Sequence, residues 1–178
     1  EIIKKSGDLY GILIEGHERF WKIKKKLNVK LSQNWIYANS THTIDLLRYF
    51  AGEFNQIFSI KNAKYHKSGV QFAMVLKSKK GIICTYISNW YSPGGWKIKL
   101  FGDKKTVVFD PLEKGYWIDK NFSKKKINPS KYDIIYKPGF YKQMLCYKNL
   151  IQNKKLDWPG QDIQNVFKTI KVIKKLIF

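Results

Sequence analysis

The segment around His42 contains the residue types best suited to proton-transfer chemistry. Residues 39–41 (Asn-Ser-Thr) commonly cap a helix, and apolar residues then recur at helical spacing as far as Gly52. The pattern predicts a helix over residues 41–51, with His42 in its first turn. Because the positive end of a helix dipole disfavours an imidazolium, we expect His42 to be neutral under physiological conditions and able to act as a general base. The alternative is a buried histidine that merely caps its own helix.

Two charged residues follow His42 on the same predicted helix. Asp45 lies three residues later, on the same face, where it would orient the imidazole or simply interact with the helix dipole. Arg48 would bind a carboxylate or phosphate, or lie solvated on the helix surface. The sequence leaves both pairs of alternatives open.

A second group of candidate binding residues surrounds Trp96. The glycine pair at 94–95 allows a ligand to approach the backbone closely, and the indole of Trp96 offers a stacking face for a sugar ring. The alternative interpretation of these residues is a plain turn between strands, with the Trp96 side chain in the core. His17 would line a pocket together with Arg19 and Trp21.

The helical segment also resembles a known family. Residues 41–49 (THTIDLLRY), followed by Gly52-Glu53, resemble a segment of the C-terminal domain of Gfo/Idh/MocA-type oxidoreductases, the glucose–fructose oxidoreductase and inositol dehydrogenase family. The strand-rich run 81–90, the turn 101–105 with the strand 106–110 after it, and two closing helices agree in order. In this family a first domain of Rossmann fold binds NAD or NADP, and the second domain supplies the substrate pocket and a sheet used for oligomerisation. The resemblance implies that this chain is the second domain.

The resemblance also implies a division of chemistry between two domains. Hydride would pass between nicotinamide C4 and a sugar carbon, while His42 and a lysine of the first domain manage the hydroxyl proton. The sequence has no G-x-G-x-x-G between a strand and a helix, and no Glu-Lys-Pro to supply that lysine. We therefore expect no cofactor-binding residues here and no catalysis by the chain alone. Because Glu1 is not an initiator methionine, we expect an excised domain rather than a complete gene product.

A further departure from the family lies four residues before His42. Family members that use an acidic partner have Asp there, whereas this sequence has Ala38, followed by Asn39. Asn39 would orient a substrate hydroxyl but cannot take a proton. Two interpretations follow: an oxidoreductase domain that depends on His42, or a sugar-binding module that has lost catalysis.

The chain is strongly basic. Its 34 Lys and Arg residues outnumber 13 Asp and Glu residues and give a net charge of +21. Such a charge favours nucleic acid, but the only arginines are Arg19 and Arg48, and bidentate recognition of phosphate or guanine favours arginine. A basic field also attracts an anionic substrate, and we expect a nucleotide sugar. The alternative is a standalone module that dimerises through its sheet and holds an acidic partner or nucleic acid.

Length and composition indicate one domain over residues 1–178, since 44% hydrophobic residues suffice for a substantial core. The sequence contains no run of about 18 apolar residues and no signal-peptide pattern, so we expect a cytoplasmic protein. Cys84 and Cys146 occur without C-x-x-C or zinc-site spacing. We expect two buried thiols, no metal and a homo-oligomer.

The predicted fold class is α+β, with an open, mainly antiparallel mixed sheet and helices on one face. Strands are predicted over 9–15, 82–91, 96–101, 106–109 and 116–118, within a strand-like region that spans 56–118.

The predicted strand 82–91 is apolar on both sides, which calls for a second cover from another subunit or a missing domain. Residues 19–30 are ambiguous between loop and helix, and 120–137 is expected to be a loop that forms a flap or an interface. Helices over 140–152 and 161–176 are expected to turn apolar stripes toward the core.

Overall fold

A computed structural model of the chain describes residues 6–63, 70–156 and 160–177. The strands are β1 (Leu9–Gly16), β2 (Phe54–Asn62), β3 (Gln71–Ser78), β4 (Ile83–Asn89), β5 (Trp96–Gly102), β6 (Lys105–Phe109), β7 (Gly115–Asp119) and β8 (Lys124–Ile127). The helices are α2 (Phe20–Ile23), α3 (Val29–Gln33), α4 (Thr41–Ala51), α5 (Lys131–Ile135), α6 (Phe140–Asn153) and α7 (Ile163–Ile177). A 3-10 turn, η1 (Lys24–Lys26), and a π-helical turn, η2 (Ile36–Ser40), lie among them.

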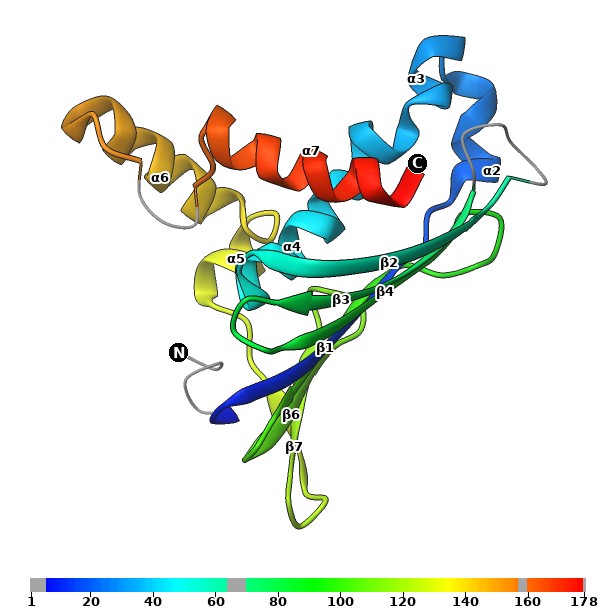
Figure 1. Cartoon of the computed structure of the whole chain (residues 1–178). Coiled ribbons are helices and arrows are strands. Elements are labelled where there is room, and N and C mark those ends of the chain that lie inside the picture. The colour runs from blue at the N-terminus through cyan, green and yellow to red at the C-terminus, as the bar shows by residue number, and fades with distance from the viewer. Residues whose placement is uncertain (1–5, 64–69, 157–159, 178) are drawn as a thin grey trace.

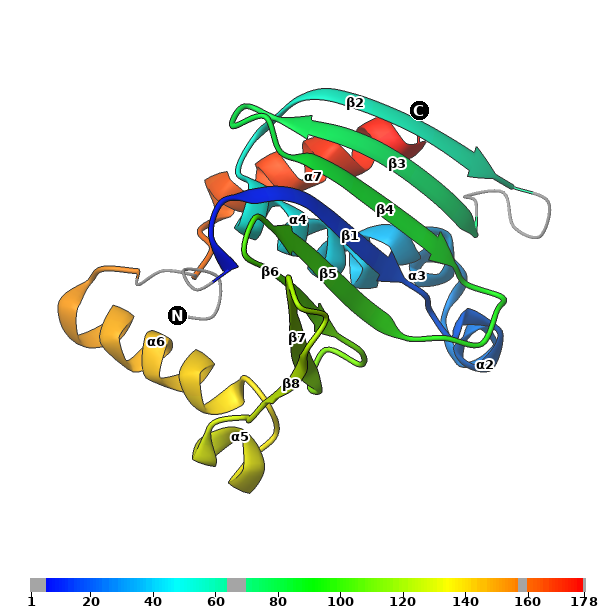
Figure 2. The same cartoon turned by 90° about the horizontal axis from the view of Figure 1, so that it is seen from below.

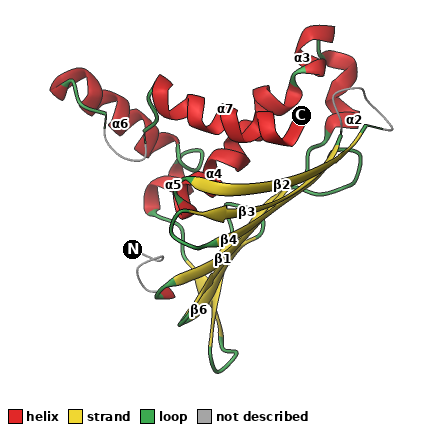
Figure 3. Ribbon diagram, in the orientation of Figure 1, coloured by secondary structure: helices red, strands yellow, loops and turns green. Residues whose placement is uncertain are grey.

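All eight strands form one open sheet in the order β2-β3-β4-β1-β5-β6-β7-β8. Strands β1 and β4 run parallel, and the other neighbouring strands pair antiparallel. Figure 1 shows α4 and α7 lying across one face of this sheet, and Figure 3 shows the same separation of helices from strands. The predicted α+β class and open mixed sheet are confirmed.

The core lies between this sheet and helices α4 and α7. The register places Ile14 of β1 beside Tyr86 of β4 and Ile98 of β5, so alternate residues of three strands point toward the helices. The buried apolar side chains facing this layer include Ile12, Ile14, Ile44, Leu47, Ala51, Phe72, Met74, Leu76, Tyr86, Leu100, Val172, Ile173 and Leu176.

Helix α7 has the end signals that its sequence predicts. Asp162 accepts a hydrogen bond from the backbone N–H of Asn165 at 2.7 Å, which satisfies one unpaired donor of the first turn. Lys174 and Lys175 lie in the last turn, where the helix dipole favours positive charge.

The other face of the sheet carries exposed apolar side chains. Figure 2, turned by 90°, looks onto this face, with α4 and α7 behind the strands. Ile83 and Ile87 of β4 alternate with the buried side chains of the same strand, and both are exposed. Further exposed apolar residues come from neighbouring strands: Phe58, Ile60, Val75 and Phe101. The predicted two-sided apolar character of strand 82–91 is therefore confirmed.

The region predicted as a loop over 120–137 contains two regular elements, so that prediction is wrong. Strand β8 extends the sheet beside β7, and the ammonium group of Lys124 lies 3.7 Å from the ring centroid of Tyr116. Helix α5 is capped by Ser130, whose Oγ accepts from the backbone N–H of Asp133. The lysine-rich composition hid the strand, and the Ser130-x-x-Asp133 capping signal was overlooked.

Residues 19–30, ambiguous in sequence, form α2, η1 and the start of α3. Asn28 caps α3 by accepting a hydrogen bond from the backbone N–H of Leu31 at 2.7 Å. The helical alternative is therefore the correct one for most of this segment.

The expected burial of the α6 stripe is wrong. No residue of α6 is buried, and Met144 and Ile151 are 59% and 62% exposed. The first half of α7 is similar, since Ile163 and Phe167 are exposed. Figures 1 and 2 show α6 lying beside the body formed by the sheet and α4, so this chain provides little to cover its apolar stripe.

Neither cysteine forms a disulfide within the part of the chain that the structure describes. Cys84 is buried in β4 as expected, and burial raises the pKa of its thiol to about 12. Cys146 on α6 is only half-buried. None of the described helices is both long and apolar enough to cross a bilayer.

Candidate functional site

Two of the residues singled out in the sequence lie next to each other. His42 on α4 and Trp96 at the start of β5 have ring centroids 6.1 Å apart, with the rings tilted by 44°. The His42 side chain is exposed, so the alternative of a buried capping histidine is wrong. An imidazole at the surface beside an indole is available both to a ligand and to solvent protons.

The start of α4 differs from the expected cap. The π-helical turn η2 leads directly into α4, and Ser40 has helical backbone angles with no capping hydrogen bond from its side chain. Thr41 instead donates its hydroxyl hydrogen to the carbonyl oxygen of Tyr37 at 2.7 Å. Because helical backbone begins before His42, the free N–H groups expected beside the imidazole are not there.

A cavity of about 510 Å³ lies beside Trp96. Its lining comes from the β1–α2 connection and the end of α2, from η2 with the residue before it, from the turn before β5 with the start of that strand, and from the segment after β6. The residues are His17, Glu18, Arg19, Ile23, Trp35, Asn39, Gly94, Gly95, Trp96, Pro111, Leu112 and Glu113.

The cavity brings together six of the residues singled out from the sequence: His17, Arg19, Asn39, Gly94, Gly95 and Trp96. Trp21, grouped with His17 in the sequence, is half-buried on α2 and does not belong to the described lining.

Glu18 is the polar residue of this cavity that sequence reasoning missed. Its side chain is 5% exposed, and it accepts hydrogen bonds from the Nδ2 amide of Asn39 and from Oγ of Ser40, the latter at 3.1 Å. Burial raises the pKa of Glu18, while the hydrogen bonds from Asn39 and Ser40 lower it in part. Nothing in the local sequence marked Glu18, because Glu15 nearby is acidic as well and the partners Asn39 and Ser40 are 21 and 22 residues away in sequence.

His17 is held through both ring nitrogens. Its Nδ1 accepts from the backbone N–H of Asn89 at 3.1 Å, which leaves Nε2 to donate to Oε2 of Glu15, also at 3.1 Å. The ring also fills the space above Gly94, where an added Cβ would lie 2.8 Å from the Cβ of His17. In this structure the close approach to Gly94 is made by His17.

Lys97 on β5 lies close to two acidic side chains. Its Nζ lies 3.1 Å from Oδ2 of Asp110 and 3.9 Å from Oε2 of Glu15. The hydrogen bond to Asp110, with the charges of Asp110 and Glu15, raises the pKa of Lys97. Lys99 on the same strand is exposed.

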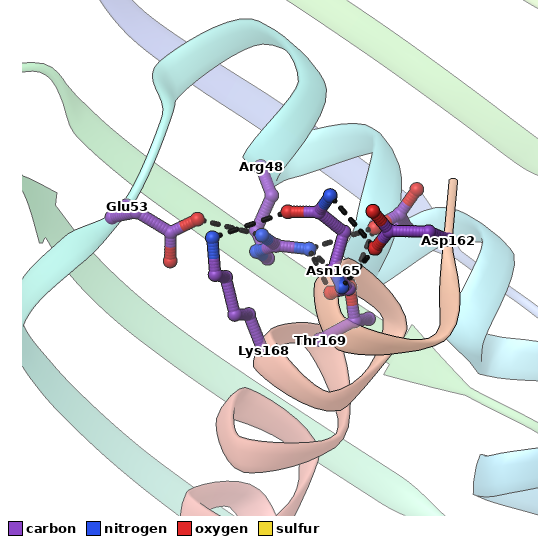
Figure 4. Close-up of polar contacts among 7 residues, drawn as sticks. Arg48, Glu53, Asp162, Asn165, Lys168 and Thr169 are labelled. Carbon is purple, nitrogen blue, oxygen red and sulfur yellow. Dashed lines mark hydrogen bonds and ion pairs between the residues drawn. The ribbon is translucent and has the colours of Figure 1, made fainter. Parts of the chain in front are cut away.

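Asp45 and Arg48 belong to a polar network between α4 and α7 (Figure 4). Arg48 is 8% exposed, so the solvated surface position is wrong. Its guanidinium donates to Oγ1 of Thr169 and Oε1 of Glu53, each at 2.6 Å. Asp45 accepts from Thr169 at 2.5 Å and from Arg48 at 3.1 Å. Both side chains join two helices and do not belong to the described lining of the cavity.

The described residues offer no dinucleotide site of the Rossmann kind. The parallel strands β1 and β4 are linked through several helices and two further strands, and the connection after β1 reads His17-Glu18-Arg19 instead of a glycine-rich turn. Within this part of the chain, no group of three or more His, Cys, Asp or Glu side chains is placed to hold a metal ion.

The sequence matches no protein-family model and no curated protein. The fold, in contrast, matches solved oxidoreductases of the Gfo/Idh/MocA type, as the sequence resemblance predicted. UDP-N-acetylglucosamine 3-dehydrogenase GnnA from Acidithiobacillus ferrooxidans is similar at a TM-score of 0.75 and 10% identity, over 98% of this chain and 56% of that chain.

Two further structures agree. The dehydrogenase MviM from Clostridium difficile has a TM-score of 0.71 and 15% identity, over 97% of this chain and 55% of its own. The WlbA dehydrogenase from Bordetella pertussis, in complex with NADH and UDP-GlcNAcA, has a TM-score of 0.67 and 14% identity, over 98% and 55% respectively. The chain therefore has the fold of about half of each of these enzymes.

Proposed function

We propose that this chain is the substrate-binding and oligomerisation domain of an NAD(P)-dependent oxidoreductase that acts on a sugar or nucleotide sugar in the cytoplasm. The observation that carries the proposal is the contact between the rings of His42 and Trp96, since Trp96 also lines a cavity with Asn39 and Arg19, in a fold shared with dehydrogenases of nucleotide sugars. Surface polysaccharide synthesis is a pathway class that uses such substrates.

Each residue around the cavity has a distinct part in this proposal. The indole of Trp96 would stack on a sugar ring, because aromatic faces pack well against apolar C–H surfaces. Asn39 would hold a substrate hydroxyl by hydrogen bonding, and Arg19, exposed at the rim, would attract an anionic group. His42, exposed beside Trp96, would exchange the proton of the reacting hydroxyl with solvent.

The cofactor would come from a different domain. The described residues provide no glycine-rich strand-to-helix turn. We therefore assign to this chain the binding of the substrate and the handling of its proton. NAD or NADP would supply the hydride chemistry when held by a Rossmann domain outside this chain.

Exposed apolar stripes support the need for further polypeptide. Met144, Tyr147 and Ile151 on α6, with Ile163 and Phe167 on α7, form amphipathic faces that this chain leaves in contact with water. A second domain would bury them. The open sheet face, with Ile83 and Phe58 among its exposed residues, would pack against a second subunit.

Calorimetric titration of the 178-residue chain with UDP-N-acetylglucosamine, NADH and a random DNA duplex tests the proposal. We expect saturable binding of the nucleotide sugar and no submicromolar binding of NADH. Replacing UDP-N-acetylglucosamine by UDP alone is the matched control, since it separates recognition of the sugar from simple attraction to a basic chain. Submicromolar NADH binding, or no binding of the sugar nucleotide at millimolar concentration, would contradict the proposal.

The net charge of +21 supports a second candidate, a standalone module that dimerises through its sheet and holds nucleic acid or an acidic partner. In that case affinity for random DNA falls steeply between low and moderate salt, because bound lysines release counterions. A shallow salt dependence would remove this candidate.

A further inference from the structure

Glu18 and Asn39 come from different segments and meet at the wall of the cavity. Glu18 lies in the connection between β1 and α2, and Asn39 lies in the π-helical turn η2. The hydrogen bond between them joins Nδ2 of Asn39 to Oε2 of Glu18. Both residues line the cavity, and both lie within the described part of the chain.

The chemistry of the pair fixes the orientation of the Asn39 amide. A carboxylate oxygen only accepts hydrogen bonds, so the NH₂ end of the amide must face Glu18. The carbonyl oxygen Oδ1 of Asn39 is then turned away from Glu18. With the amide held this way, Asn39 offers the cavity an acceptor rather than a full NH₂ donor.

Ser40 holds the carboxylate itself in place. Its Oγ, in a fully buried side chain, donates to Oε1 of Glu18 at 3.1 Å. Because each oxygen of Glu18 receives a hydrogen bond from a different residue of η2, rotation of the carboxyl group would break at least one of them. The arrangement is rigid as long as Glu18 is ionised.

Protonation of Glu18 removes that constraint. A protonated carboxyl group has one O–H donor and one carbonyl oxygen. Its O–H can donate to Oδ1 of Asn39, or its carbonyl oxygen can accept from the NH₂ group of Asn39, and the two hydrogen bonds are similar in strength. The amide can then turn over at little cost and present its NH₂ end to the cavity. Burial raises the pKa of Glu18, which brings this event closer to neutral pH.

The charged and titratable surroundings of Glu18 come from its own connection and from two other places. His17 and Arg19 flank it in the chain, and Glu113 lies across the cavity after β6. Tyr86 of β4 lies on the core side, and burial raises the pKa of its hydroxyl, so it is uncharged. Arg19 is exposed to solvent, so it does not offset the burial of Glu18.

We propose that Glu18 is a positioning residue that selects which end of the Asn39 amide faces the cavity. With Glu18 ionised, the site accepts a hydrogen bond from a ligand hydroxyl or N–H group; with Glu18 protonated, it also admits a ligand acceptor. The identity of the ligand as a nucleotide sugar rests on the proposed function, whereas the Glu18–Asn39 coupling does not.

Nuclear magnetic resonance of the 178-residue chain tests the coupling without any ligand. The carboxyl carbon of Glu18 and the side-chain amide of Asn39 are followed across a pH titration, with Asn39→Ala used to assign the amide signal. We expect both signals to change with the same midpoint, and Glu18→Gln to remove that transition from Asn39. Asp8→Asn is the control, because Asp8 is exposed and does not belong to the described lining of the cavity, and its substitution changes the net charge equally.

The inference is overturned if the Asn39 amide signal does not change as Glu18 titrates. It is also overturned if the pH-dependent change of that signal persists in Glu18→Gln. If Glu18→Gln does not fold, Asn39→Ala serves instead. With Nδ2 of Asn39 removed, the carboxyl of Glu18 loses a hydrogen bond to its ionised form, and its titration midpoint must rise. An unchanged midpoint in that variant overturns the inference equally.

A second arm uses UDP-N-acetylglucosamine as the probe. We expect its affinity for the unsubstituted chain to fall roughly 2-fold as pH drops through the Glu18 midpoint, because an amide that turns over freely offers its carbonyl oxygen to the cavity about half of the time. We expect this pH-dependent loss of affinity to be absent in Glu18→Gln and in Asn39→Ala, and to persist in Asp8→Asn. If no variant binds the probe while the amide titration behaves as expected, the proposed function fails and the positioning inference stands.

Discussion

The imidazole of His42 and the indole of Trp96 lie 6.1 Å apart between ring centroids, although one belongs to a helix and the other to a strand far along the chain. The sheet brings them together, because β5 lies next to β1 and the η2–α4 segment follows from β1. A proton-exchanging group is thereby placed beside a stacking surface, which is the arrangement that the proposed reaction on a sugar would use.

Removing the Trp96 indole should weaken ligand binding without unfolding the chain. We expect Trp96→Ala to lower the affinity for UDP-N-acetylglucosamine by about 1 to 2 kcal/mol, since one aromatic stacking contact with its buried area is lost. Calorimetric titration gives the affinity. Phe122→Ala is the matched control, because Phe122 is 89% exposed and outside the cavity lining. Equal losses in the two variants would refute the role of Trp96.

Arg48 should be important for stability rather than for ligand binding. Arg48→Met removes the hydrogen-bond donors to Thr169 and Glu53. It also leaves the carboxylate of Asp45 without the guanidinium that it pairs with. We expect a loss of about 3 to 5 kcal/mol in the free energy of unfolding, measured by urea denaturation.

Lys168→Ala serves as the control for Arg48. Among the described residues, the Lys168 ammonium donates to an exposed Asn165 oxygen, so the expected loss is below about 0.5 kcal/mol. A stable Arg48→Met chain with weakened binding of UDP-N-acetylglucosamine would instead point to a ligand contact.

The turn before β5 distinguishes two neighbouring glycines. In Gly94→Ala the new Cβ would lie 2.8 Å from the Cβ of His17, so the ring must move and its hydrogen bonds to Glu15 and Asn89 are disturbed. We expect a loss of about 1 to 3 kcal/mol of stability in urea denaturation.

Gly95→Ala should behave differently, because a Cβ there meets nothing within 4 Å. We expect a change of less than about 1 kcal/mol, in either direction. If the two glycine substitutions lower the free energy of unfolding equally, the tight packing of His17 over Gly94 is not what restricts this turn.

The buried Glu18 should give stability a specific pH dependence. Its pKa is raised above the ordinary value of 4.5 by burial, so the folded chain binds this proton more tightly than the unfolded chain. The contribution to stability is therefore greatest below pH 4.5 and is lost as pH rises through the folded pKa. Urea denaturation of the unsubstituted chain and of Glu18→Gln over this range should show a difference that grows in favour of Glu18→Gln as pH rises. A constant difference, or one of opposite sign, would contradict the burial account.

Much of the fold follows from periodicity in the sequence. Helix α4 and strands β4, β5 and β6 lie where alternating or helical apolar spacing predicted them, because each has one face against the core. The α6 stripe shows the limit of this reasoning. Its spacing correctly predicted an amphipathic helix, but spacing does not identify what covers the stripe, and this chain leaves it exposed.

The candidate site was predicted only in part. His42, Asn39 and Trp96 carried local signals of residue type and spacing, whereas Glu18 in a short connection carried none. Its importance comes from contacts with Asn39 and Ser40, which are separated from it by 21 and 22 residues. Arg48 was misjudged for the same reason, since the partner helix α7 that buries it lies more than 100 residues further along the chain.

The most direct measurement is a titration of the ¹⁵N-labelled chain with UDP-N-acetylglucosamine, followed through the indole N–H signals of its six tryptophans. The account predicts a saturable shift of the Trp96 signal, together with the Asn39 side-chain amide, while Trp117 on β7 stays unchanged. A shift centred on Trp117, or no saturable shift at millimolar sugar nucleotide, would contradict the claim that the cavity beside His42 and Trp96 binds the substrate.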